Sequence, residues 1–474
     1  MRTRTEKDSL GKKEVPEDAY YGIQSLRARE NFQITDLNIH PRLVKSLALV
    51  KKAAAISNRE VGLLNQEKAG AIIQAAEEVA AGELKDQFIV DAVQGGAGTS
   101  INMNMNEVLA NRAIEILGEQ KGDYRIVHPN NHVNMGQSTN DVIPTSIRIT
   151  AINMLQEVVE KVDELRKALE AKGEEFDDVI KMGRTQLQDA VPIRMGQEFA
   201  AYARAVLRDK ERLEETIDDL KIINLGATAV GTGLNADQDY VENVTQILSE
   251  VTDLNLSQAE DLIDATQNVD ALVGLSSALK TCASNLSKIA SDLRLMSSGP
   301  RTGLNEIDLP AVQPGSSIMP GKVNPVIPEV INQISYHIMG NDNTITKAAE
   351  AGQLELNVMQ PVLMYNLFQS MEMLRNGIDT FVNNCIVDIK VNRDRCKALV
   401  DQSVSIITAI NPHVGYEKAA YIAKKALNEN KSVQEIILDE GILSEEELNK
   451  ILDPYEMTEP GIAGRELLDY QNQD

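Results

Sequence analysis

The chain has 474 residues, and its 47 lysine and arginine side chains against 71 aspartate and glutamate side chains give a formal net charge of −24. This length suffices for a large core in two or more domains, while the acidic charge repels nucleic acid and anionic membranes. An anionic substrate would therefore need a local concentration of cations, N–H groups and helix N-termini.

The N-terminal residues 1–8 are polar and charged, and they lack the apolar core of a secretion signal. We find no apolar stretch of about 18 residues that could span a membrane. The cysteines, Cys282, Cys385 and Cys396, lie in apolar helical patterns without metal-site spacing, so we expect buried free thiols. We therefore expect a cytoplasmic protein with no nucleic-acid or membrane partner.

Long amphipathic helices dominate the predicted structure, because apolar residues recur three and four positions apart. The predicted helices cover residues 41–61, 65–81, 144–172, 196–223, 265–295 and 325–339. Strand signals are short, at 32–37 and 87–90, so we expect only minor β structure. Helices of about 25–30 residues span roughly 40 Å, which is long enough for helices of different subunits to pack side by side.

We divide the chain into three parts with soft boundaries. A mixed, mostly helical N-terminal domain covers residues 1–141, and a central long-helix domain covers 142–392. A small helical C-terminal domain covers 393–474. In the last domain, Ser444 and Glu447 predict a helix start with a capping box.

Three polar, glycine-rich segments interrupt the helices. Residues 94–104 contain glycines that let backbone N–H groups approach a ligand, and Thr99 or Ser100 can cap a helix that begins there. Residues 134–141 place Ser138, Thr139 and Asn140 before a helix, where hydroxyl, amide and N–H donors meet. Either segment alone could also be an ordinary loop-to-helix turn.

The third segment, residues 315–325, combines two serines, two glycines and two prolines with Lys322 and Asn324, directly before a helix. A loop with flexible glycines and fixed prolines can close over a substrate and exclude water. Lys181, Arg184 and Arg301 add local cations in other polar segments. The alternative is a solvated surface loop, although the segment lacks the runs of charge typical of one.

Several chemistries lack their motifs. The five histidines lie in no HExxH pattern and beside no GxSxG turn, and neither a dinucleotide-binding nor a P-loop glycine pattern occurs. Hydroxyls, amides and a lysine acting on an anionic substrate remain. Proton abstraction beside a carboxylate, with fixed donors that hold the developing charge, fits these residues.

Residues 315–325 (GSSIMPGKVNP) resemble the signature loop of the fumarase/aspartase superfamily. GAGTS at 96–100, QSTND at 137–141, GRT at 183–185 and SGPR at 298–301 resemble the other motifs of that superfamily in the same order. The resemblance implies a mainly α fold with a central long-helix bundle, and a homotetramer whose active sites are assembled from three subunits. It requires no cofactor or metal for the chemistry and leaves divalent-ion activation open.

Residues 351–359, 324–333 and 453–457 with 460–464 resemble the aspartase branch more than the fumarase branch. That branch implies reversible deamination of L-aspartate to fumarate and ammonia, through removal of a Cβ proton and an aci-carboxylate intermediate. One alternative is fumarate hydratase, which converts L-malate to fumarate and water, and another is a catalytically silent helical assembly. Argininosuccinate- and adenylosuccinate-type lyases differ in the details of the loop.

The resemblance also implies a role for each motif. Ser316 would be the base, ionised by loop amides and nearby positive charge. The substrate would be bound by Thr99, Ser138, Thr139, Asn140, Thr185, Gln186, Ser317, Lys322 and Asn324. Of these, Thr99, Ser138, Thr139, Thr185 and Ser317 would hold the carboxylates, and Asn140 would bind the α-amino group or its neighbouring carboxylate.

Gln186 departs from the pattern of many members, which carry a histidine there that pairs with the residue matching Glu329. Glutamine can donate a hydrogen bond to a carboxylate but cannot titrate. We therefore assign Gln186 to substrate binding and leave the general acid open.

Overall fold

The computed structural model describes residues 2–35 and 37–468, which form two compact units. Of the described residues, the first unit comprises 2–35, 37–160, 211–283 and 335–375, and the second comprises 161–210, 284–334 and 376–468. The three-part division at residues 141 and 392 stays a prediction.

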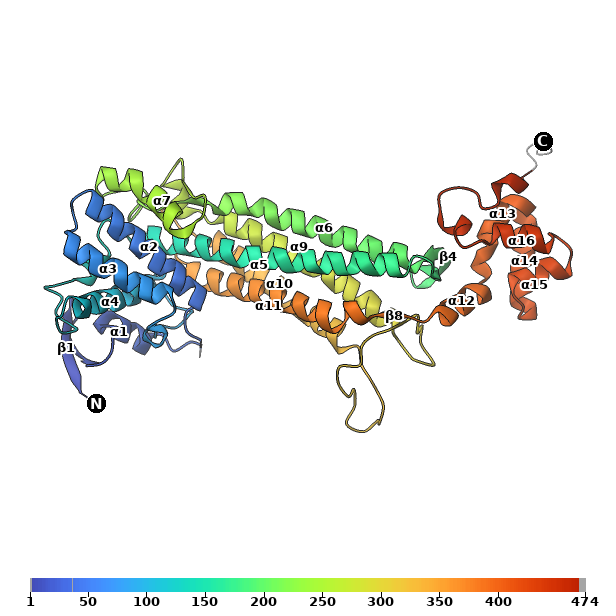
Figure 1. The fold of residues 1–474 in the computed structure, drawn as a ribbon, viewed down its shortest axis with the longest axis horizontal. Coiled ribbons are helices and arrows are strands. Elements are labelled where there is room, and N and C mark those ends of the chain that lie inside the picture. Colours follow the sequence, from blue (N-terminus) through green and yellow to red (C-terminus); the bar gives the residue numbers. More distant parts are fainter. Residues whose placement is uncertain (1, 36, 469–474) are drawn as a thin grey trace. The chain divides into compact units, whose positions relative to one another are not determined.

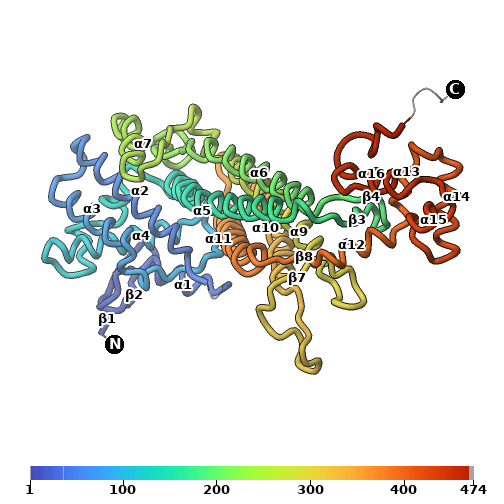
Figure 2. Tube along the Cα trace, turned by 45° about the vertical axis from the view of Figure 1, so that its right-hand side comes forward, coloured from blue at the N-terminus to red at the C-terminus, as the bar shows by residue number. Residues whose placement is uncertain are grey.

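Five long helices each begin in one unit and end in the other. Figures 1 and 2 show them side by side, and they are α5 (Thr139–Glu175), α6 (Met195–Leu220), α9 (Asp270–Met296), α10 (Val326–Glu350) and α11 (Gln360–Asn384). Their inward faces are apolar, with leucine, isoleucine, valine and phenylalanine side chains fully buried along them. The predicted mainly α fold with a long-helix bundle is confirmed.

The first unit surrounds its part of this bundle with shorter elements. These are the hairpin β1 (Thr3–Asp8) and β2 (Gly11–Pro16), the helices α1 (Ile23–Asn31), α2 (Pro41–Glu60), α3 (Gln66–Ala80), α4 (Thr99–Ile116), α7 (Gln238–Thr252) and α8 (Asp264–Gln267), a π-helical turn (Pro129–Val133), and the short parallel pair β5 (Ile222–Ile223) and β6 (Ser257–Gln258). Helix α2 packs against α3 and α7, and α3 packs against α4. Two of the candidate motifs lie at the starts of α4 and α5.

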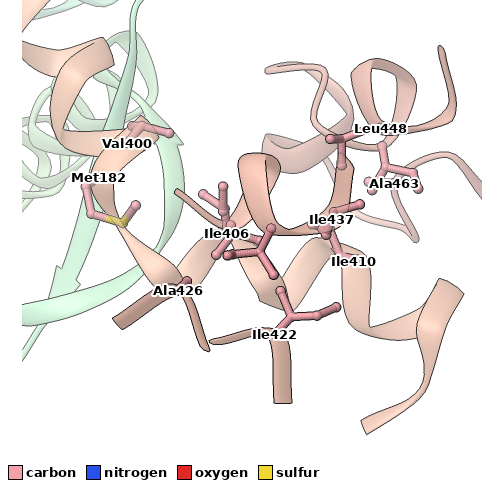
Figure 3. Close-up of a cluster of buried hydrophobic side chains, with 12 residues drawn as sticks. Met182, Val400, Ile406, Ile410, Ile422, Ala426, Ile437, Leu448 and Ala463 are labelled. Atoms are coloured by element: carbon pink, nitrogen blue, oxygen red, sulfur yellow. The ribbon is translucent and has the colours of Figure 1, made fainter. Parts of the chain in front are cut away.

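The second unit carries the antiparallel hairpin of β3 (Ile180–Thr185) and β4 (Gln188–Arg194), and the antiparallel pair β7 (Ile307–Asp308) and β8 (Lys390–Val391). Its C-terminal helices are α12 (Arg393–Gln402), α13 (Ile407–Val414), α14 (Tyr416–Glu429), α15 (Val433–Asp439) and α16 (Glu445–Ile451). They enclose a cluster that includes Ile410, Ile422 and Ile437 (Figure 3). Met182 of β3 joins this cluster, so the hairpin is anchored to the C-terminal helices.

Local signals predict the helix ends well where a cap is present. Helix α2 begins at Pro41 as predicted, behind His40, whose ring nitrogen accepts the Arg42 N–H. Helix α3 begins at Gln66, one residue after the predicted start at Asn65, which caps it, and Ser444 and Glu447 form the predicted capping box of α16. The three cysteines are buried and free, as predicted.

Other predicted bounds are wrong in instructive ways. Helix α5 begins five residues before Pro144, which lies inside its N-terminal part. The predicted helix 265–295 is two helices, α8 and α9, separated at residues 268–269, and α10 continues to Glu350. The predicted strands 32–37 and 87–90 are not strands over their described residues, whereas the hairpins β1–β2 and β3–β4 were missed. Within the described part of the chain, each helix is too short or too polar to cross a bilayer.

Candidate active site

The first glycine-rich segment folds into a tight turn before α4. Gly96, Ala97 and Gly98 all have positive φ angles of 94°, 58° and 89°. A Cβ atom on Gly98 would lie 3.2 Å from the side chain of Ile143, so glycine permits both the backbone conformation and the close approach to α5. This turn brings the N-terminus of α4 beside α5.

Thr99 is the first residue of α4 and is exposed. Its hydroxyl donates to the carbonyl oxygen of Gly96 at 2.7 Å, and the helix cap position is Gly98. The prediction that Thr99 or Ser100 caps the helix is therefore wrong, because both residues lie inside α4. With its hydrogen used in this way, the Thr99 oxygen has lone pairs that can accept from a ligand N–H.

The hydroxyl groups of Ser138 and Thr139 differ from that of Thr99, because within the protein they accept hydrogen bonds. The Ser138 hydroxyl oxygen accepts the N–H of Asn140 at 3.2 Å, and the Thr139 hydroxyl oxygen accepts from the Asn102 side-chain amide at 3.3 Å. Each hydroxyl already accepts a hydrogen bond, so its own hydrogen can be donated to a ligand oxygen. Two donors beside the positive end of α5 suit a carboxylate.

Asn140 is held at both its backbone and its side chain. Its side-chain NH₂ donates to the carbonyl of Ala229 at 2.7 Å, which leaves the side-chain oxygen as an acceptor. Its backbone carbonyl accepts from the Asn224 side chain at 3.1 Å. Pro144 lacks the N–H that would otherwise bond this carbonyl within the helix, so the sequence leaves it free for Asn224.

Asp141 holds the segment 138–140 from the protein interior and is fully buried. Its carboxylate accepts the backbone N–H groups of Ser138, Gly226 and Thr228 at 2.9, 3.2 and 3.1 Å. Burial raises the pKa of Asp141 to about 6, against the opposing effect of these N–H groups and of Lys51. The pair Lys51 and Asp141 was missed by the sequence analysis.

A signal for Lys51 does exist. On α2, Leu47, Lys51 and Ala54 follow one another at four and three positions, and all three are buried. A lysine in an apolar helix stripe therefore marks a buried polar contact. The identity of its partners could not be read from the sequence.

Thr185 and Gln186 lie at the tip of the β3–β4 hairpin and are exposed. Gln186 and Leu187 have φ angles of 54° and 61°, so the two-residue turn is left-handed at both central positions. Leucine is disfavoured in this conformation by about 1–2 kcal/mol. The surrounding contacts must therefore hold the tip in place.

These contacts are buried ion pairs along strand β3. Arg184 lies 2.9 Å from the carboxylate of Glu306, and Lys181 lies 3.5 Å from it. Lys181 also bonds Glu198 at 2.6 Å. Glu306 is completely buried, so its charge is balanced by the two cations that flank the strand leading to Thr185.

The segment between β7 and α10 leaves the helices as an extended loop (Figure 2). Within it, the Ser316 hydroxyl oxygen accepts the backbone N–H groups of Ile318 and Met319 at 3.2 and 3.0 Å. Hydrogen bonds to the ionised form of a group lower its pKa. The loop therefore turns two N–H dipoles onto the oxygen that is the candidate base.

The two ends of this loop are tied together. Gly315 donates its N–H to the carbonyl of Lys322 at 2.7 Å, and Asn324 donates its side-chain NH₂ to the carbonyl of Gly315 at 2.8 Å. Ser317 and Lys322 are exposed, while Ser316 and Asn324 are half-buried. The candidate base Ser316 and the loop cation Lys322 thus lie on one closed turn.

The candidate residues therefore fall into two sets. Thr99, Ser138, Thr139 and Asn140 lie in the first unit, at the N-termini of α4 and α5. The second unit holds Thr185 and Gln186 on the hairpin tip, together with the loop residues Ser316, Ser317, Lys322 and Asn324. Each set combines hydroxyl and amide groups of the kind that bind a carboxylate.

Comparisons with known proteins agree over nearly the whole chain. Residues 11–340 match a family described as lyase, and residues 406–459 match the fumarase C C-terminus. The chain is 58% identical over 462 residues to an aspartate ammonia-lyase of a Bacillus species, covering 98% of this chain and 99% of that one. It is 56% identical to an aspartate ammonia-lyase of Bacillus subtilis strain 168, covering 98% of each.

Two solved structures have the same fold. The crystal structure of fumarate lyase:delta crystallin from Brucella melitensis bound to cobalt gives a TM-score of 0.95 at 50% identity, over 97% of this chain and 100% of that one. The recombinant class II fumarase from Schistosoma mansoni gives a TM-score of 0.92 at 36% identity, over 97% and 100% of the two chains.

Proposed function

We infer the function from the premise that this chain belongs to the fumarase/aspartase superfamily of lyases, and we propose that it deaminates L-aspartate reversibly to fumarate and ammonia. The choice of L-aspartate as substrate rests on the sequence identity of 58% over 462 residues with an aspartate ammonia-lyase. The identity with the class II fumarase is 36%.

Ser316 acts as the base. Its alkoxide removes a proton from Cβ, and the electron pair moves onto the neighbouring carboxylate as an aci-carboxylate. The N–H groups of Ile318 and Met319 support the ionised serine, since both point at its oxygen. Exclusion of water by the loop strengthens these contacts further.

The hydroxyls of the first unit bind the two kinds of polar group on the substrate. Ser138 and Thr139 donate to a carboxylate, where they stabilise the additional charge of the intermediate. Thr99 and Asn140 present acceptor oxygens, which suit the ammonium group. When the intermediate collapses, the Cα–N bond breaks, ammonia leaves and the Cα=Cβ bond forms.

The second unit supplies the remaining carboxylate donors. Thr185, Gln186 and Ser317 donate neutral hydrogen bonds, and Lys322 adds a positive charge. Asn324 supports the loop through Gly315 while it fixes a substrate oxygen. We assign no proton transfer to Gln186, because an amide does not titrate, so ammonia departs without a general acid at that position.

We further propose a cytoplasmic homotetramer whose sites are shared between subunits and whose chemistry needs no cofactor. The long helices and the division of the candidate residues between two sets support this arrangement. Light scattering measures the oligomer. Mixing the two inactive variants Ser316→Ala and Thr139→Ala should restore part of the activity if one active site contains these residues from different subunits. Absence of any recovery would contradict shared active sites.

The substrate assignment is tested by incubating purified protein with L-aspartate and, separately, with L-malate, while fumarate absorbance is followed. We expect turnover of L-aspartate, and turnover of L-malate alone would refute the proposal. The Ser316→Ala variant should lose turnover and keep the parent's oligomeric state. Unchanged activity in that variant would remove Ser316 from its role.

A further inference from the structure

The segment that leads into Ser138 and Thr139 rests on a buried lysine. Lys51 of α2 is completely buried, and its ammonium group donates to the side-chain oxygens of Asn134 at 2.8 Å and Gln137 at 2.9 Å. Both acceptors belong to the turn that precedes α5. Lys51 thus holds residues 134–137 from the protein interior and is not itself a candidate substrate ligand.

A chain of hydrogen bonds continues from this lysine to a candidate substrate ligand. The Asn134 side-chain oxygen also accepts from Asn102 at 3.1 Å, and Asn102 in turn donates to the Thr139 hydroxyl oxygen at 3.3 Å. Asn102 is buried as well. Its amide therefore has one hydrogen on the lysine-bound oxygen and the other on Thr139, which fixes the direction in which the Thr139 hydroxyl can donate.

Stability alone gives no reason for a lysine here. Burying a charge costs free energy that its interactions only partly offset. Replacing a buried charged side chain by an apolar one of similar volume therefore often leaves the stability unchanged or increases it. Burial lowers the pKa of Lys51 to about 7, while the neighbouring charge of Asp141 opposes that shift. Asp141 fixes the Ser138 N–H from the other side, so this pair encloses the segment.

We propose that Lys51 is a positioning residue of the dicarboxylate site, which holds residues 134–137 through Asn134 and Gln137 and orients the Thr139 hydroxyl toward the substrate through Asn102. The inference rests on the proposed function, because it needs Thr139 to bind a substrate carboxylate. The lysine also places positive charge behind the donors of a strongly acidic chain, where an anionic ligand gains from it.

The test compares Lys51→Met with Lys52→Met. The control residue is the next one on α2 and pairs with Glu77 at 2.7 Å, outside this network. We expect Lys51→Met to raise the fumarate Kd, measured by calorimetry, and the KM for L-aspartate by about ten-fold or more, as for a lost hydrogen bond to a charged group. Lys52→Met should leave both values within about two-fold of the parent.

A second variant separates positioning from folding. Asn102→Ala keeps the lysine and removes the donor to Thr139, so it should also raise the fumarate Kd by about ten-fold. In the double variant the Kd should not exceed that of the weaker-binding single variant, because both changes break one chain of contacts. If Lys51→Met does not assemble, Asn102→Ala alone decides.

Three outcomes would overturn the inference: a folded Lys51→Met protein with the parent's fumarate Kd, parent-like binding in Asn102→Ala, or multiplicative effects in the double variant. A parent protein that binds fumarate but releases no ammonia from L-aspartate would instead refute the proposed function. The comparison of fumarate Kd values would remain valid in that case, since fumarate is common to the ammonia-lyase and hydratase reactions.

Discussion

The buried carboxylate of Glu306, which directly precedes β7, pairs with Lys181 and Arg184 of the β3–β4 hairpin, and we predict that Glu306→Gln loosens this hairpin. The substitution keeps the size of the side chain and removes its charge. Arg184 at 2.9 Å and Lys181 at 3.5 Å then lose the anion between them, while Lys181 keeps Glu198. One uncompensated positive charge remains at a site where Glu306 itself is completely buried.

Breaking a buried ion pair by removing one partner costs about 3–5 kcal/mol. We expect the lower end, about 3 kcal/mol, because Lys181 retains a carboxylate partner. Since about 1.36 kcal/mol corresponds to a factor of ten, amide exchange through local opening of the hairpin should accelerate by roughly one hundred-fold. The KM for L-aspartate should rise too, because Arg184 directly precedes Thr185.

Hydrogen–deuterium exchange of peptides covering residues 180–194 measures this change, and Glu459→Gln is the matched control. Glu459 pairs with Arg194 on the same hairpin at 2.7 Å, but its side chain is 55% exposed. Because the Glu459 carboxylate is largely solvated, that pair should contribute less than about 1 kcal/mol. Equal exchange in the two variants, or parent-like exchange in Glu306→Gln, would refute the argument that burial gives Glu306 its importance.

Three further predictions concern other parts of the chain. Gln186→His should add a group with a pKa near about 6.5, so the KM for L-aspartate should fall relative to the parent as pH drops through that value; parallel pH profiles would contradict this. Gly98→Ala should destabilise by about 1–2 kcal/mol, through its positive φ and the contact with Ile143, and by more than Gly118→Ala, whose added Cβ meets nothing within 4 Å; equal melting temperatures would contradict it. Burial raises the pKa of Asp91, but N–H groups of the neighbouring loop and a threonine hydroxyl outweigh it and hold the pKa below the ordinary value. The stabilisation of the fold by ionised Asp91 is therefore present above about pH 4 and lost below. The difference in melting temperature between the parent and Asp91→Asn should shrink on acidification, and a constant difference would contradict this.

Local sequence signals predicted those features that depend on neighbouring residues. Asn65 caps α3 and Ser444 caps α16, since a side-chain oxygen three residues away satisfies a free N–H in each case. The glycine-rich segments were recognised as anion sites because glycine and hydroxyl residues cluster in them. Anion binding at these segments stays a prediction, while the turn before α4 has the positive φ angles that glycine permits.

Features that depend on distant residues were not predictable in this way. The strands of β1 and β2 are largely charged and have little apolar alternation, and contacts such as that of the Tyr124 hydroxyl with the Glu6 carboxylate, 118 positions apart, help to hold them. The contact of Lys51 with Gln137 joins residues 86 positions apart. Helical periodicity could place Lys51 on a buried face, but only the fold shows which turn lies opposite.

Pro144 carries a consequence for protein engineering. Exchanging a proline inside a helix for alanine is a common stabilising choice, because alanine has the higher helix propensity. Here the new N–H would compete with Asn224 for the carbonyl of Asn140. The segment 224–229 would then lose one of its two hydrogen bonds to Asn140 and keep only the bond between the Asn140 side chain and the carbonyl of Ala229. A redesign guided by helix propensity alone would thus select a more regular helix and a less well-ordered Asn140, the candidate ligand of the amino group.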